Sequence, residues 1–402
     1  MKPLLLLLAL SGMVSPLLAD SSDTRSWCDA LSDSPGLLYQ SDNNPWVQSV
    51  EVSGRFHYQA AYVEGKDVNG ARFNDRYDDY RRFRLGTEIE FLRFFKAEVE
   101  SNLVEDRRHR DSPPQELDWG HQDFQRLTLE VDLDNLFDLR ALDKLELTYG
   151  RMKLPVGAEL HQSSRHIFTV ERSSLSNQIS SMDGTPTGVT LSLGKGDWEL
   201  DLGLHSTDDD AEGLASWNAG LLYVMSLAWE PGDFRFVFDQ VFNDPSGDDF
   251  GAGYDWVSSL SGTYDADRWG LMVNAAYGDN GGANQGNVLA RRQGEFYGVM
   301  VMPWLWIVED HLQWVVQGEW VKGDQSQGVR LGSRYIRARH DNPAIDVDSG
   351  RGEAILRIYT GLNWHLCEQN AKIMAGVSHA RLSARQGDVS ASAVEVAFRT
   401  YF

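Results

Sequence analysis

Basic side chains recur at alternate positions in several segments of this sequence. In YRRFRLGTE, Arg82 and Arg84 stand two residues apart, and so do Arg151 and Lys153 in YGRMKLP. A guanidinium group can form two parallel hydrogen bonds with an oxyanion, and a line of such groups can pass an anion along without binding it irreversibly. The pattern predicts an anion path. Its candidate residues are Arg55, Arg82, Arg84, Lys96, Arg126, Arg151 and Lys153, with Arg165 and Arg172 from a longer connection.

Carboxylates occupy equivalent alternate positions. The acidic residues expected on the same face are Glu51, Glu88, Glu90, Glu98, Glu100, Glu130, Asp132, Glu199, Asp201, Glu319 and Glu395. The simplest interpretation of any one of them is that it pairs with an arginine and solvates a polar wall.

The segments that position these residues alternate apolar and polar side chains, and their connections are by turns short and long. This is typical of an outer-membrane barrel with short periplasmic turns and long extracellular loops. We expect sixteen strands, at 48–64, 78–92, 95–106, 122–134, 144–154, 186–194, 198–207, 217–230, 233–243, 254–264, 268–278, 295–306, 311–322, 353–366, 371–382 and 391–402. An even number places both ends on the periplasmic side, so that the last strand can pair with the first.

The position of the large aromatic residues favours a membrane barrel over a soluble sandwich. A sandwich would also alternate, because one face of each sheet is wet. Here tryptophan and tyrosine gather near strand ends, as two interfacial girdles require, and no fixed-period repeat indicates a solenoid. The girdle candidates are Trp217, Trp229, Trp256, Trp269, Trp304, Trp306, Trp314, Trp320, Trp364, Tyr223, Tyr254, Tyr277 and Tyr401. The predicted fold is all-β, a 16-stranded antiparallel transmembrane β-barrel.

The ends of the chain predict its location. Residues 1–19 have a lysine, an apolar run and a terminal alanine, which is the pattern of a cleaved secretory signal peptide. We expect a periplasmic segment at 20–46 and the barrel at 47–402, and Phe402 is similar to the terminal signal of barrels inserted into the bacterial outer membrane. The net charge of -22 argues against a nucleic-acid partner.

The longest connection, residues 155–185, combines charges with the apolar residues Ile167, Phe168, Val170, Leu175 and Ile179. A purely solvated loop does not need this apolar set, so we expect the loop to fold inward and narrow the channel as a constriction loop. The alternative is an outer loop packed on a neighbouring loop or subunit.

The two cysteines, Cys28 and Cys367, lie near opposite ends of the chain. Barrel closure would bring both to the periplasmic rim, where an oxidising compartment permits a disulfide. Two free thiols are the alternative.

No motif for catalysis or for a cofactor is present. The sequence lacks G-x-S-x-G, H-E-x-x-H and a glycine-rich phosphate loop, and the strand histidines have no matching serine and carboxylate. DVDSG at 346–350 begins like a calcium loop, but Arg357 stands where a glutamate should close it. We expect no metal site, and the acidic runs at 207–213 and 243–251 are expected to meet the phosphates of lipid and lipopolysaccharide through divalent cations.

The segment YGRMKLPVGAEL with ERSSLSNQI, and the arginine-rich YRRFRLGTE, resemble the phosphate-selective porin O and P family. The resemblance implies a homotrimeric channel for phosphate and other small anions, with Arg81, Arg82 and Arg84 on the arginine-bearing strand and Arg151 and Lys153 at the loop exit. Net acidity and few wall lysines depart from that pattern.

The function predicted from the sequence is an outer-membrane porin for passive diffusion of small hydrophilic solutes, with a preference for anions such as phosphate as a refinement. About sixteen strands leave a lumen that side chains cannot fill. The alternatives are a barrel enzyme, and a structural or adhesin barrel without an open pore.

Overall fold

The structure is a computed structural model. It describes residues 28, 31, 36–105, 109–110, 115–139, 141–180, 185–208, 213–218, 220–245, 252–281, 292–332, 334–336, 350–385 and 387–402. The predicted signal peptide and the DVDS residues at 346–349 lie outside these residues. No helix in the described part of the chain is both long and apolar enough to span a membrane.

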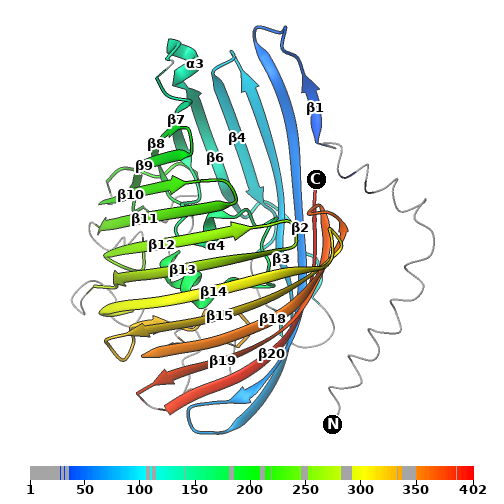
Figure 1. Cartoon of the computed structure of the whole chain (residues 1–402), viewed down its shortest axis with the longest axis vertical. Helices are drawn as coiled ribbons and strands as arrows, with labels where there is room; N and C mark the ends of the chain where they lie inside the picture. Colours follow the sequence, from blue (N-terminus) through cyan, green and yellow to red (C-terminus); the bar gives the residue numbers. More distant parts are fainter. Residues whose placement is uncertain are drawn as a thin grey trace.

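Sixteen strands pair in antiparallel order around a closed barrel, which confirms the predicted fold class (Figure 1). They are β2 (Val47–Lys66), β3 (Arg72–Phe91), β4 (Phe95–Asn102), β6 (Asp123–Asp132), β7 (Lys144–Arg151), β8 (Thr187–Lys195), β9 (Trp198–Ser206), β10 (Gly220–Trp229), β11 (Phe234–Pro245), β12 (Trp256–Asp265), β13 (Trp269–Asp279), β14 (Glu295–Val308), β15 (Leu312–Gly323), β18 (Ala354–Cys367), β19 (Ala371–Ala384) and β20 (Gly387–Tyr401).

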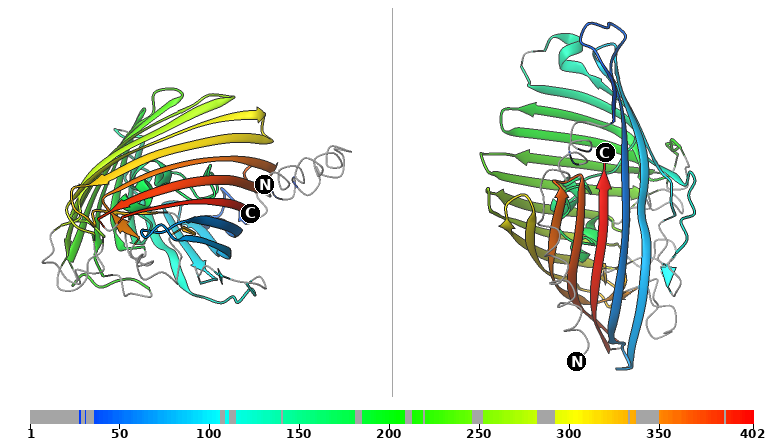
Figure 2. Two further views of the ribbon diagram at one scale, coloured as in Figure 1. Left: turned by 90° about the horizontal axis from the view of Figure 1, so that it is seen from below. Right: turned by 90° about the vertical axis from the view of Figure 1, so that its right-hand side faces the viewer.

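The barrel closes where β20 pairs with β2, and Figure 2 shows these two strands side by side. Beyond the end of β20, Phe402 and Gly54 exchange two backbone hydrogen bonds, which extend the pairing to the last residue. The terminal residues of the chain are therefore part of the wall.

The short elements lie at the rims or inside. They are β1 (Leu37–Gln40), which pairs with β2; β5 (His109–Arg110), which pairs with β3; the two-stranded β16 (Val329–Arg330) and β17 (Arg351–Gly352); and the helices α3 (Leu133–Phe137), α4 (Ala158–His161) and α5 (Ser174–Ile179).

Strand β3 begins at Arg72, six residues before the predicted start at 78. The sequence NDRYDD is polar enough to predict a loop, but Phe73 and Tyr77 are buried on the inner side of the barrel. The Tyr77 ring lies 5.8 Å from the ring of Tyr335, which belongs to an inward-folded connection between β15 and β18. Contact with that connection extends the strand.

The outer face carries an apolar band with aromatic rings at its edge. At the end with the short turns, the ring centroids of Trp198 and Trp229 lie 5.5 Å apart, and Tyr264 lies 4.7 Å from Phe234 and 5.0 Å from Trp269. Stacked rings at one level are what an interfacial girdle requires.

Four predicted girdle residues are not on the outer face. Trp304 and Trp306 lie on the inner side of β14, opposite in phase to the exposed Leu305 and Ile307. Tyr254 and Tyr401 are buried, and Tyr401 bonds to His57 on the inner side of the barrel. The Trp304 ring stacks on Phe168 with 4.4 Å between centroids. The inner face of β14 is apolar because it packs against the connection between β7 and β8, so apolar residues occupy both faces of this strand.

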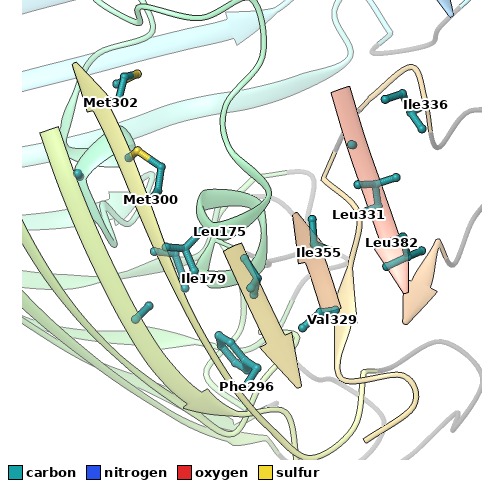
Figure 3. Close-up of a cluster of buried hydrophobic side chains, with 14 of the residues drawn as sticks. Leu175, Ile179, Phe296, Met300, Met302, Val329, Leu331, Ile336, Ile355 and Leu382 are labelled. Atoms are coloured by element: carbon teal, nitrogen blue, oxygen red, sulfur yellow. The ribbon is translucent and has the colours of Figure 1, made fainter. Parts of the chain in front are cut away.

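An apolar core fills one side of the barrel interior. Leu175 and Ile179 of α5 pack between Met300 and Phe296 of β14 and the apolar residues Val329, Leu331, Ile336, Ile355 and Leu382 (Figure 3). Leu175, Ile179, Phe296 and Met300 are fully buried, and each such side chain contributes about 1.5–3 kcal/mol. The interior is therefore solvated mainly along the opposite wall, β3 to β9.

A β-bulge interrupts the pairing of β2 with β3. His57 pairs with Arg82 and Tyr58 pairs with Tyr80, so that Arg81 is the extra residue of the bulge. A bulge of this kind re-aims a side chain, and here Arg81 turns to the inner side beside Arg82, where its Nε lies 3.0 Å from Glu171.

The structure joins Cys28 and Cys367 in a disulfide, with 5.1 Å between their Cα atoms and no free cysteine among the described residues. Asn370 also donates a hydrogen bond to the backbone oxygen of Leu31. The segment before β1 is thus fixed to the short turn between β18 and β19, next to the barrel seam.

We predict that Cys28→Ser/Cys367→Ser lowers the melting temperature of the detergent-solubilised barrel. The crosslink spans 339 residues, and the loss of such a long closed loop is worth up to about 5 kcal/mol in the chain-entropy picture. The measurement is thermal unfolding followed by circular dichroism with and without reductant. The double variant should respond to neither reductant nor oxidant, and a wild-type barrel that titrates as two free thiols after unfolding without reductant would contradict the assignment.

Candidate functional site

The described part of the connection between β7 and β8, residues 152–180 and 185–186, crosses the inside of the barrel and carries α4 and α5 (Figure 1). Near its start, the backbone N–H of Gly157 donates to Asp239 of β11 over 2.7 Å. On the opposite wall, Arg55 of β2 donates to Ser164 over 2.6 Å, and Arg81 contacts Glu171. The loop is tied to both sides of the lumen, so it divides the barrel at this level.

Gly157 permits the sharp entry of the loop into the lumen. Its φ is +82°, a conformation that glycine adopts without strain. A Cβ at this position would lie 2.3 Å from Cδ1 of Ile179 and 2.7 Å from Oδ1 of Asn274. The glycine of the LPVGAEL segment is therefore required by both backbone and packing.

Six basic side chains gather where the loop meets β2 and β3: Arg55, Arg81, Arg82, Arg84, Lys153 and Arg172. We call them the basic cluster. Four come from two neighbouring strands and two from the loop. In the pairing of β2 with β3, Arg55 lies directly opposite Arg84, an arrangement of like charges that costs stability.

Three carboxylates lie close to the basic cluster. Glu100 binds Arg55 at 3.3 Å and Arg84 at 3.1 Å, and Glu171 binds Arg81. The carboxylate of the third, Glu159, accepts hydrogen bonds from Ser173, Ser176 and Gln317. Its interaction with the Arg172 guanidinium is electrostatic. Among the described residues, six cations thus face three carboxylates, which leaves a surplus of three positive charges there when Lys153 is protonated.

The surplus is visible in the contacts of three cations. Within the described residues, Arg82 bonds to the Nδ1 of His57, Arg172 to the backbone oxygen of Glu159, and Lys153 to the backbone oxygen of Leu160, none of them to a carboxylate. One guanidinium nitrogen each of Arg55, Arg84 and Arg172 is buried without a hydrogen-bond partner. Buried donors without partners are costly.

The loop groups show the positive potential in their pKa values. The pKa of Lys153 is lowered to about 6 by the protein around it and by the charges of Arg172, Arg82, Arg84 and Arg55. The Lys153 side chain is exposed to the lumen. Burial alone would raise the pKa of Glu171, but Arg81, Arg334 and Arg82 hold that pKa well below its usual range.

Arg165 borders the basic cluster from the loop. Its guanidinium carbon and that of Arg55 each lie 5.8 Å from the ring centroid of Tyr401, close enough for a cation–π contact.

Three other predicted residues do not join the cluster. Lys96 pairs with Glu130 at 3.1 Å and Arg126 with Glu98 at 2.6 Å, both on the lumen side nearer the short turns. Arg151 of β7 lies opposite Leu127 of β6, and both residues are at positions that point outward from the barrel. Its guanidinium binds Thr185 and the backbone oxygen of Gly213, so it ties long connections together at the other rim.

A row of basic residues continues from the cluster along the inner wall, and the sequence analysis did not find it. Cross-strand pairs run His365 to Lys372, Lys372 to Arg399, Arg399 to His57, and His57 to Arg82. All five are buried, and Lys372 and Arg399 bond to the backbone oxygens of Ile167 and Val170 in the loop. Single basic residues on five strands form a row only once the strand register is known.

Comparison with known proteins adds the family. The model of the family described as phosphate-selective porin O and P matches residues 50–232, a range that includes β2 to β10 and the crossing loop. The resemblance seen in the sequence is confirmed. Over residues 50–232 the chain is similar to the phosphate-selective porin O and P family. No curated protein sequence matches the chain significantly.

Solved structures share the fold of this porin at low sequence identity. The outer membrane channel DcaP of Acinetobacter baumannii is 12% identical, with a TM-score of 0.56 over 90% of this chain and 99% of that one. The loop L8 deletion mutant of OmpT of Vibrio cholerae is 11% identical, with a TM-score of 0.53 over 88% of this chain and 99% of that one. Salmonella typhi OmpF in complex with daunomycin is 12% identical, with a TM-score of 0.53 over 90% and 99%. The predicted location in the bacterial outer membrane is confirmed.

We predict that Gly157→Val displaces the crossing loop and raises single-channel conductance, because the new side chain must occupy the space of Ile179. Purified variants reconstituted in planar bilayers supply the measurement. The matched control is Gly70→Val, since Gly70 has a similar φ of +76° but open space around it. Equal conductance of Gly157→Val and wild type, with the barrel folded, would show that Gly157 does not set the loop position.

Proposed function

We propose that this porin passes small hydrophilic anions by diffusion through the gap beside the crossing loop. The single observation that carries the preference for anions is the surplus of positive charge in the basic cluster, on both the wall and the loop at the level where the loop narrows the lumen. Charges in a water-filled constriction attract ions of opposite sign and repel the others.

The basic cluster suits a compact oxyanion. Arg55 and Arg84 are only partly buried, and guanidinium forks match the geometry of phosphate or carboxylate oxygens. The name of the matching family supports phosphate among the permeant anions. Basic side chains on several residues would hold an anion weakly at successive positions, as conduction requires.

Two further parts of the proposal concern assembly and lipid. The homotrimer rests on the family resemblance. Contact with lipopolysaccharide is supported by a groove of about 450 Å³ on the outer face at the long-loop end, lined in part by Lys66, His379 and Arg381. Ammonium and guanidinium groups there could meet lipid phosphates.

We predict that Arg84→Gln lowers the ratio of anion to cation permeability. A unit charge about 7 Å from an ion in water contributes about 0.6 kcal/mol, and screening in about 0.1 M salt leaves roughly half of this. Removal of the charge makes the site less favourable for an anion and more favourable for a cation by this amount, so the ratio should fall about threefold. The measurement is the reversal potential of reconstituted channels in a potassium chloride gradient, with inorganic phosphate added to test competition with chloride.

Arg126→Gln is the matched control, because Arg126 also faces the lumen but pairs with Glu98 outside the basic cluster. Its effect on the ratio should be clearly smaller. A wild-type channel that prefers potassium over chloride and is unaffected by phosphate would reject the anion preference, and a folded barrel without measurable current would reject the channel itself.

We predict that anion preference decreases as pH rises, because Lys153 loses its charge below the ordinary lysine pKa. Reversal potentials should be compared at about pH 5.5 and about pH 9.5. Protonation of lumen glutamates at low pH also raises the anion preference, so the variant Lys153→Met is needed to isolate the contribution of the lysine. This variant should lose up to about a threefold part of the change in permeability ratio between the two pH values. Lys153→Arg is charged at both pH values. It should show the same reduced pH dependence as Lys153→Met, with a higher anion preference than that variant at both pH values.

A further inference from the structure

The glutamates of β2, β3 and β4 face one another across the strands instead of facing arginines. Glu51 of β2 pairs in register with Glu88 of β3, and Glu88 pairs with Glu98 of β4. All three are on the lumen side and none is buried. We call them the glutamate row. Side chains directly opposite each other lie about 5 Å apart, so three like charges in a row are destabilising.

Only one member of the glutamate row is neutralised by an ion pair. Glu98 binds Arg126 at 2.6 Å, but neither Glu51 nor Glu88 has an ion-pair partner among the described residues. The next row toward the short turns holds Glu90, Lys96 and Glu130, one cation between two carboxylates. This end of the lumen is therefore net negative.

The basic cluster lies on the same two strands, four residues away. Arg55 follows Glu51 on β2, and Arg84 precedes Glu88 on β3, so the antiparallel register sets arginine opposite arginine and glutamate opposite glutamate. A register that only solvated the wall would gain stability from opposite charges face to face. Separation of the two signs into zones instead indicates selection for a potential that changes sign along the channel.

We propose that the lumen is bipolar, positive at the crossing loop and negative toward the short turns, and that it favours small zwitterionic solutes such as short extended peptides. The two zones are roughly 13 Å apart along the strands, from a rise of about 3.3 Å per residue. An extended peptide of about four residues has the same distance between its end charges. Its carboxylate would meet Arg55 and Arg84 while its ammonium group meets Glu51 and Glu88. This inference rests on the proposed channel function and specifies its solute class.

A bipolar lumen also conducts unequally in the two directions. When the long-loop side is negative, anions enter the positive zone and cations enter the negative zone, and both zones fill with carriers. With the opposite polarity both zones are depleted. The current should therefore be larger with the long-loop side negative, by about twofold in about 0.1 M salt, and nearly symmetric in about 1 M salt, where the screening length is only about 3 Å.

The electrical test compares wild type with Glu51→Gln/Glu88→Gln in planar bilayers at about 0.1 M potassium chloride. Removing these two charges leaves the pair of Glu98 with Arg126 intact and relieves like-charge repulsion, so the variant should fold. Orientation is fixed for each channel by a thiol reagent added to one side of channels that carry Gly70→Cys, at the long-loop end of β2 and β3. The double variant should lose the asymmetry, and Glu64→Gln, the same change on the outward phase of β2, should keep it.

The solute test measures liposome swelling with tetraglycine and with its N-acetylated, C-amidated form, which is of similar size but uncharged. Tetraglycine should enter wild-type vesicles faster, and Glu51→Gln/Glu88→Gln should remove that difference. Equal entry of both peptides into wild-type vesicles overturns the solute class, and a symmetric low-salt current overturns the bipolar lumen. If either result is found while the channel still prefers anions, the proposed anion channel stands and only the further inference is rejected. A preference for cations, or the absence of current, rejects the proposed anion channel itself.

Discussion

Closure of the backbone hydrogen-bond network is the constraint on which the rest of this structure depends. In hydrocarbon, every unpaired N–H or C=O group costs several kcal/mol, so a sheet can cross a membrane only when its first and last strands pair. Here β20 pairs with β2 over twelve positions, and Phe402 and Gly54 complete the seam. Once the sheet is closed, the period of two along each strand assigns one set of side chains to lipid and the other to the lumen.

The lumen is then organised by the crossing loop. Its apolar residues, Leu175 and Ile179 above all, pack against Phe296 and Met300 of β14 and Val321 of β15. The backbone N–H of Leu175 also donates to the buried Glu319 of β15. This packing occupies one side of the interior and leaves the solvated charges on the opposite wall. The same apolar contacts hold Lys153 and Arg172 of the loop toward β2 and β3, so a hydrophobic core positions an electrostatic site.

Electrostatic cost is concentrated where the loop meets the wall. Arginine opposite arginine, glutamate opposite glutamate and buried guanidinium nitrogens without partners each reduce stability. A barrel of this size tolerates such local losses because the hydrogen bonds of sixteen strands and the apolar core are unaffected. Local violations of pairing rules are expected at functional sites.

The sequence by itself determined the strands, their number and most of their faces, because the side-chain period is a local property of extended backbone. It also indicated the inward loop, through apolar residues that a solvated connection would not carry. The alternation of Leu145, Leu147 and Tyr149 already places Arg151 on the outward face of its strand, although its basic side chain suggested a position in the lumen. Only the tertiary structure decided which basic residues meet. The bulge that turns Arg81 inward, the register that aligns Arg399 with His57, and the packing that draws Trp304 inside all depend on pairings between segments far apart in the chain, and such pairings leave no mark in the local pattern.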